Sequence, residues 1–162
     1  MNATAEKVQQ YKQMQDFTQF LISNVQFVKE KASIEILNGI DKAVARSKGM
    51  SATPFAGQIA VKLKRYGFNI TNTQNSETPS SGSYLLIHGL EPLDATISAI
   101  QTFLPFTDIR YDTGSILTGL DENGKEYSYF EGTDITIMLG ADYLLGSESL
   151  SGLVQKKFSY DL

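Results

Sequence analysis

The stretch TPFAGQIAVKLKRYGFNI, from Thr53 to Ile70, decides the fold class, because the spacing of its apolar residues changes within it. Thr53-Pro54 is a favourable helix start, since the Thr hydroxyl accepts from free backbone N–H groups and Pro fits the first turn. Gly67 is suited to end the helix, and Phe68 to Thr73 then has strand character. Helical spacing between these points is carried by Ala56, Ile59, Ala60, Leu63 and Tyr66.

Strands are predicted on both sides of this helix. SIEILNG, Ser33 to Gly39, is an apolar strand that ends at Asn-Gly, a pair typical of turns. Later come further strands, a second helix and an Asn123-Gly124 hairpin turn. The strands span Tyr84–His88, Thr107–Tyr111, Ser115–Leu120, Glu126–Phe130 and Asp134–Leu139, and the helix spans Leu93–Leu104. This order predicts an α/β (α+β) sandwich, in which two helices pack on a small mixed sheet of about five strands, with an inserted β-hairpin.

An amphipathic helix is predicted before the sheet, from Thr4 to Lys31, where the chain has no Gly or Pro. Its apolar seam has alternating spacings of three and four residues, which suits both a helix packed on its own domain and a stalk or pairing helix. The seam consists of Tyr11, Met14, Thr18, Leu21, Val25 and Val28, and Phe17, Phe20 and Phe27 widen it. We therefore divide the chain into this helix (1–32), an α/β domain (33–146) and a tail (147–162).

Composition excludes several classes of protein. The chain has 162 residues, a net charge of −4 and only three arginines, which argues against a nucleic-acid partner. It has no cysteine and a single histidine, His88, so thiolate and multi-histidine metal sites are excluded and no cofactor is expected. No apolar run reaches the roughly 20 residues that span a bilayer. Membrane anchoring is therefore expected only through a segment absent from this chain.

Three local features have competing interpretations. Ile40 to Ala52 carries several cations and is interpreted as a mobile basic loop. Asp121 to Glu126 is acidic enough to suggest calcium, but its spacing departs from that of a calcium loop and favours the hairpin turn. His88 ends a strand, and no nucleophile motif accompanies it, so no catalytic residue is assigned and no enzymatic activity is expected.

Four segments in this order resemble the C-terminal domain of the LytR/CpsA/Psr cell-envelope proteins: IEILNG, TPFAGQIAVKLKRYGFNI, SYLLIHG and DITIMLGADY. The matching features are a strand ending in Asn38-Gly39, a helix ending in Gly67, and a last strand that runs into Leu-Gly-x-Asp-Tyr at 139–143. The resemblance covers about Ser33 to Leu145. The chain departs from the family pattern at Ile40 to Ala52, which is longer, and at the inserted hairpin.

This resemblance implies an exported, extracytoplasmic protein of the bacterial cell envelope. Nothing in the chain resembles the family's catalytic domain, which attaches glycopolymers to the wall. The expected function is therefore that of a non-catalytic accessory module that binds cell-wall glycan such as peptidoglycan. The alternative is a protein-interaction or oligomerisation domain that binds another envelope protein or pairs through the N-terminal helix.

Candidate ligand-binding residues lie at the strand ends and on the hairpin. Asn38-Gly39 and Asp142-Tyr143 follow apolar strands, where binding residues are often found, although both pairs also suit plain turns. Tyr127 and Tyr129 share one face of the hairpin and are candidates to stack on sugars; the competing interpretation is that the sheet buries them. Tyr111 and Phe130 also lie around the hairpin and are candidates for the same sugar-stacking platform.

Overall fold

The computed structural model describes residues 3–52 and 55–145, and it confirms the predicted α/β class. The helices are α1 (Ala3–Ser23), α2 (Val25–Glu30), α3 (Lys42–Ser47), α4 (Phe55–Arg65), α5 (Asp94–Phe103) and α6 (Asp142–Leu145). The strands are β1 (Ser33–Asn38), β2 (Asn69–Asn75), β3 (Tyr84–His88), β4 (Ile109–Asp112), β5 (Ile116–Leu120), β6 (Glu126–Phe130) and β7 (Ile135–Leu139). The predicted tail, 147–162, and the Thr53-Pro54 helix start lie outside the described residues.

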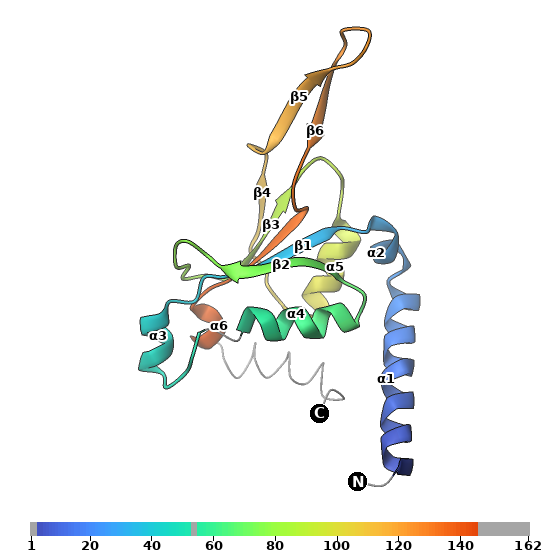
Figure 1. Ribbon diagram of the computed structural model, residues 1–162, viewed down its shortest axis with the longest axis vertical. Coiled ribbons are helices and arrows are strands. Elements are labelled where there is room, and N and C mark those ends of the chain that lie inside the picture. Colours follow the sequence, from blue (N-terminus) through green and yellow to red (C-terminus); the bar gives the residue numbers. More distant parts are fainter. Residues whose placement is uncertain (1–2, 53–54, 146–162) are drawn as a thin grey trace.

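Five strands form one mixed sheet in the order β2-β1-β7-β3-β4, and β5 and β6 form the separate hairpin (Figure 1). β1 is parallel to both β2 and β7, whereas β3 is antiparallel to β7 and parallel to β4. Ser33 and Asp134 fasten the start of β1 to the start of β7. The Ser33 N–H donates to the Asp134 carboxylate at 2.8 Å, and the Asp134 N–H donates to the Ser33 hydroxyl at 3.0 Å.

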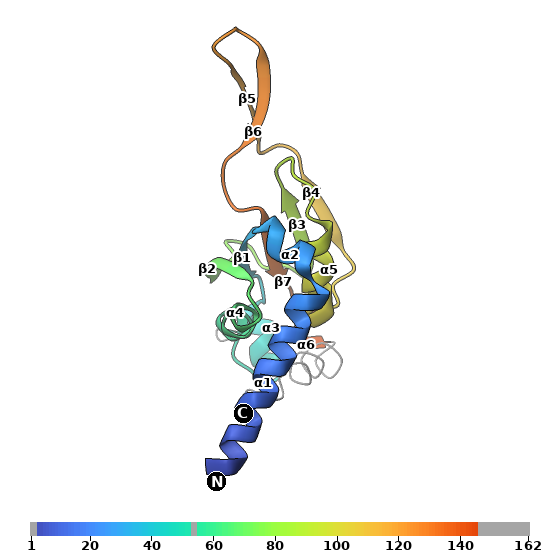
Figure 2. The same ribbon diagram turned by 90° about the vertical axis from the view of Figure 1, so that its right-hand side faces the viewer.

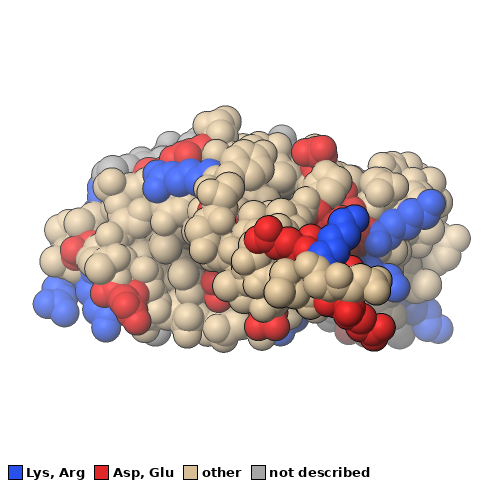
Figure 3. Space-filling model, turned by 90° about the horizontal axis from the view of Figure 1, so that it is seen from above, with Lys and Arg blue, Asp and Glu red and all other residues tan. Residues whose placement is uncertain are grey.

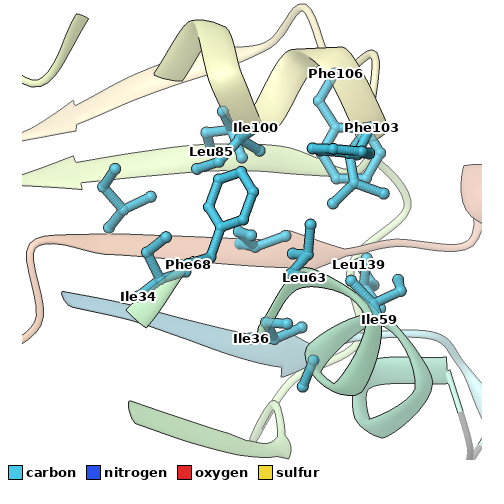
Figure 4. Packing of buried hydrophobic residues seen from close by; sticks show 14 of the residues in the cluster. Ile34, Ile36, Ile59, Leu63, Phe68, Leu85, Ile100, Phe103, Phe106 and Leu139 are labelled. Atoms are coloured by element: carbon cyan, nitrogen blue, oxygen red, sulfur yellow. The ribbon is translucent and has the colours of Figure 1, made fainter. Parts of the chain in front are cut away.

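The two faces of the sheet differ in burial. Alternate residues of β1 and β3 point into the core, and the residues between them are only half-buried. Figure 4 shows side chains of both α4 and α5 meeting the inward strand residues in one cluster. The cluster includes Ile34, Ile36, Leu63, Leu85, Ile100 and Phe103, each at most 3% exposed. The opposite face of the sheet is therefore where partly exposed polar strand residues gather.

The sequence predicted one continuous N-terminal helix. The structure instead has two helices, α1 and α2, separated by a break at Asn24. The Asn24 side chain donates to the Phe20 carbonyl at 2.8 Å, and such local bonds compete with the helical ladder. Phe20 and Phe27 pack into an aromatic cluster of the domain, with Phe27 at 4.5 Å from Phe68 and Phe20 at 5.3 Å from Phe103 between ring centroids. The interpretation as a helix packed on its own domain holds for this end, and the rest of α1 extends past the domain (Figures 1 and 2).

The predicted basic loop from Ile40 to Ala52 is wrong in part, because it contains the short helix α3. Asp41 is its N-cap, and its carboxylate accepts from the N–H groups of Ala43 at 2.7 Å and Val44 at 3.3 Å. Ala45, on the inner side of α3, is fully buried. The cap from Asp41 therefore explains why this segment, which the sequence marks mainly by its basic residues, begins with a helix.

Glu30, the last residue of α2, caps the N-terminus of α5. Its carboxylate accepts from the N–H groups of Ala95 at 3.2 Å and Thr96 at 2.8 Å, and from the Thr96 hydroxyl. Leu93, at the N-cap position of α5, has no side chain that could accept these bonds. Glu30 therefore joins the N-terminal helices to the domain and satisfies the free donors of α5.

Replacing Glu30 by alanine is expected to lower the free energy of unfolding by about 1–2 kcal/mol, because the start of α5 loses its acceptor. Urea denaturation followed by circular dichroism measures the change. Glu91→Ala removes an exposed carboxylate close to the same helix and serves as the control. Equal stability of the two variants would contradict the capping role.

Candidate functional site

The two strand ends singled out in the sequence lie side by side in the structure. The Gly39 N–H donates to the carbonyl of Leu139 at 2.8 Å, as expected for the carboxyl ends of parallel neighbours. A Cβ at Gly39 would lie 2.8 Å from the Met138 sulfur and 2.9 Å from the Leu139 carbonyl oxygen, so glycine permits the approach. Ser80 then binds both ends, donating its N–H to the Gly39 carbonyl and accepting from the Ala141 N–H.

Asn38 and Asp142 are engaged within the molecule. The Asn38 side chain is buried, donates its amide to the Ala52 carbonyl, and accepts from the Ile40 N–H at 3.1 Å. The Asp142 carboxylate accepts from both the N–H and the hydroxyl of Ser83. Both side chains therefore hold loops in place, and this accounts for the polar residues at these two positions.

Tyr143 is also part of the fold. Its side chain is only 4% exposed, and its ring lies 5.3 Å from that of Phe55 in an edge-to-face contact. A cavity of about 310 Å³ lies beside the other strand end and is lined by Asn38–Lys42, Ala52, Asn75–Glu77 and Pro79. Asp142 and Tyr143 do not line it. The strand ends thus meet, but their four candidate residues do not converge on one pocket.

Tyr127 and Tyr129 lie together on one face of the hairpin, as predicted from alternation. Their ring centroids are 5.6 Å apart, with an angle of 38° between the ring planes. Tyr127 is opposite Gly119 in the register, and a Cβ at Gly119 would come within 3.0 Å of the Tyr127 ring. The glycine therefore leaves room for the ring to lie across the hairpin. Tyr127 is 49% exposed, so the sheet does not bury it.

The other two aromatic residues near the hairpin are placed elsewhere. Phe130 points to the opposite face of the hairpin and stacks on His88, with ring centroids 5.9 Å apart and an angle of 5°. It also packs against Gly89, whose φ of +82° and close approach to the Phe130 ring both favour glycine. Tyr111 is 67% exposed on β4. Phe130 thus anchors the base of the hairpin, and Tyr127 and Tyr129 remain as a pair.

A chain of polar side chains on the half-buried face of the sheet escaped the sequence analysis. The Thr136 hydroxyl donates to Glu35 at 2.7 Å and lies 2.9 Å from Nε2 of His88. Nδ1 of His88 lies 3.0 Å from Asp112, which also accepts from the Ser115 hydroxyl. These residues come from β1, β7, β3, β4 and the following turn. Only the register of the sheet brings them together, so spacing along the sequence gives no signal for them.

The connectivity of this chain limits its chemistry. Thr136, His88 and Asp112 have the connectivity of a hydrolase triad, but the Thr136 side chain is 2% exposed and directs its proton to Glu35. Its hydroxyl therefore has neither the access nor the orientation of a nucleophile. Hydrogen bonds from Ser115, His88 and the Gly114 N–H hold the pKa of Asp112 below its ordinary value.

Charged residues on the described surface are mixed in sign. Figure 3 shows acidic and basic groups interspersed between wide uncharged areas on the face seen from above. At the hairpin turn, the Asp121 carboxylate accepts from the N–H groups of Asn123 and Lys125, as turn chemistry requires.

Within residues 3–52 and 55–145, no three potential metal-ligating side chains lie close enough together to hold a metal ion. In the same residues, no helix is long and apolar enough to span a bilayer.

Comparison with known proteins gives no relative. No protein-family model, curated protein or solved structure matches this chain. The resemblance to the LytR/CpsA/Psr C-terminal domain therefore stays a prediction from sequence motifs. Function has to be argued from the surfaces described above.

Proposed function

We propose that the chain is a non-catalytic accessory module of a LytR/CpsA/Psr-like envelope protein that binds cell-wall glycan outside the membrane. The binding surface is the face of the hairpin that carries Tyr127 and Tyr129. The observation that carries this proposal is the pair of tyrosine rings, held side by side on a hairpin that extends beyond the five-stranded sheet (Figure 1). The order of family-like motifs supports the cellular setting.

The chemistry of the pair suits a sugar polymer. A tyrosine ring offers an apolar face to the C–H groups of a sugar, and its hydroxyl remains available for hydrogen bonds. Leu117 lies opposite Tyr129 in the register and is 42% exposed, so it extends the apolar surface beside the rings. The hairpin carries three acidic residues, Asp121, Glu122 and Glu126, and one basic residue, Lys125, and this excess of negative charge disfavours a polyanionic ligand.

Co-sedimentation of the full chain with purified peptidoglycan sacculi tests the proposal. The wild-type chain is expected to be retained, and the Tyr127→Ala/Tyr129→Ala double variant is expected to bind roughly five- to 150-fold more weakly, since each lost aromatic contact costs roughly 0.5–1.5 kcal/mol. The hairpin lies outside the hydrophobic cluster, so the variant keeps the circular dichroism spectrum of the folded chain.

Two control variants separate ring stacking from other effects. Tyr127→Phe/Tyr129→Phe keeps both rings and is expected to retain most of the binding. Tyr111→Ala removes an exposed ring from β4 and is expected to leave binding unchanged. Absence of wild-type retention in any salt condition overturns glycan binding, and equal loss with Tyr111→Ala would remove the hairpin as its site.

A further inference from the structure

One face of α1 is apolar and exposed to solvent. The exposed fractions are 63% for Val8, 65% for Tyr11, 66% for Met14 and 64% for Ile22. Phe17 lies beside them at 36% exposure. With Tyr11 and Thr18 at a and with Met14 and Leu21 at d of a seven-residue repeat, all five fall on positions a, d, e or g. We call this the α1 seam. It is the set of positions that faces a partner helix in a coiled coil.

The surface of the seam has the shape that helix pairing uses. A hollow on α1 is lined by Tyr11, Met14, Gln15 and Thr18, together with Asp16 and Gln19. The first four stand at i, i+3, i+4 and i+7, the four residues that form the hole for one side chain of a facing helix. An apolar side chain of a second helix would fill this hollow.

The domain leaves the seam accessible. Phe20 and Phe27 pack against the domain. Both fall at position c of the same repeat, so the side of the helix that packs on the domain is not the side that carries the seam. Leu21 is where the seam reaches the domain, since a Cβ at Gly67 would lie 3.6 Å from its side chain. The exposed seam residues before Leu21 are therefore Val8, Tyr11, Met14, Phe17 and Thr18. In Figure 2 this part of α1 extends beyond the sheet.

The break at Asn24 corrects the extent of the seam. The sequence pattern places Val25 and Val28 in the seam, but in the structure they lie on α2, beyond the break. About two heptads remain on α1. Two heptads give weak association, because short helices contribute few paired side chains.

We propose that the α1 seam binds the same seam of a second copy of this chain. Between Val8 and Ile22, positions a, d, e and g carry no charged residue, so two copies meet without repulsion between like charges. A copy also brings the same seven-residue spacing and a Met14 or Tyr11 side chain to fill the hollow. A membrane surface is the less fitting occupant, because basic residues are few along α1.

Sedimentation equilibrium of the full chain over a concentration series tests this proposal. The weight-average mass is expected to rise with concentration from 17.9 kDa towards twice that value. Met14→Glu places a charge in the seam and is expected to raise the dissociation constant at least about tenfold. Because Met14 is exposed, the monomer of this variant keeps its circular dichroism spectrum and thermal midpoint.

Gln26→Glu is the matched control, since it adds the same charge at an exposed position of α2 outside the seam. It is expected to associate like the wild type. A wild-type mass of 17.9 kDa at every concentration overturns the proposal, as does a dimer that Met14→Glu leaves unchanged. Retention of a monomeric wild type on phosphatidylglycerol vesicles, lost in Met14→Glu, would assign the seam to a membrane surface instead.

Discussion

A methyl group at Gly140 is expected to lower the free energy of unfolding by about 3 kcal/mol, because overpacking here meets backbone. The Cβ of an alanine would lie 2.4 Å from both the carbonyl carbon and oxygen of Gly82 and 2.8 Å from its nitrogen. A side chain could rotate away, but Gly82 belongs to a loop fastened on both sides. Ser80 binds the ends of β1 and β7, and Ser83 binds Asp142.

Gly57→Ala is the matched substitution for this test. Gly57 lies inside α4, and a Cβ there meets nothing within 4 Å. Alanine at this position is expected to stabilise the fold by about 0.5–1 kcal/mol, since it reduces the freedom of the unfolded chain. Chemical denaturation of both variants gives the two values. If Gly140→Ala were as stable as Gly57→Ala, the close approach of the two loops would be disproved.

Leu63→Ala is expected to cost about 2–5 kcal/mol, because it removes a fully buried side chain from the centre of the core. Figure 4 shows Leu63 among the strand residues that α4 covers. Neighbouring side chains come from a twisted sheet and two helices, so they cannot collapse fully into the space left behind. The lost contacts and the remaining cavity both contribute to the cost.

Val61→Ala provides the comparison on the same helix. Val61 is 55% exposed, and its truncation is expected to change stability by less than about 0.5 kcal/mol. Thermal and urea unfolding of the two variants measure the difference. A similar small effect for both would show that α4 does not pack its Leu63 side against the sheet.

The order of helices and strands was predictable because each element carries its own periodicity. The alternating burial of β1 and the helical spacing in α4 are properties of consecutive residues. Two local features escaped because one polar side chain decides each of them. Asn24 breaks the N-terminal helix through a bond to Phe20, and Asp41 starts α3 by capping it. Neither bond changes the apolar pattern of the sequence.

The candidate sites also differ in how far the sequence alone predicts them. Alternation placed Tyr127 and Tyr129 on one face, but their exposure depends on the hairpin extending past the sheet. The chain from Glu35 through His88 to Asp112 depends on which strands are neighbours, and that order is not written in any local spacing. The sequence therefore predicts which side chains share a face of a single strand or helix. Groups of side chains from several strands become visible only once the strand order is known.

The position of β7 in the sheet affects the order in which the strands can pair as the chain folds. It lies between β1 and β3, yet it follows every other strand of the sheet in the sequence. The β1-α4-β2 and β3-α5-β4 units are separate halves until β7 enters between them, so their inner edges stay open during synthesis. Contacts this distant along the chain make folding slow, and open strand edges are templates for aggregation. Until Leu139 has been made, the inner edges of β1 and β3 therefore have no complete strand to pair with.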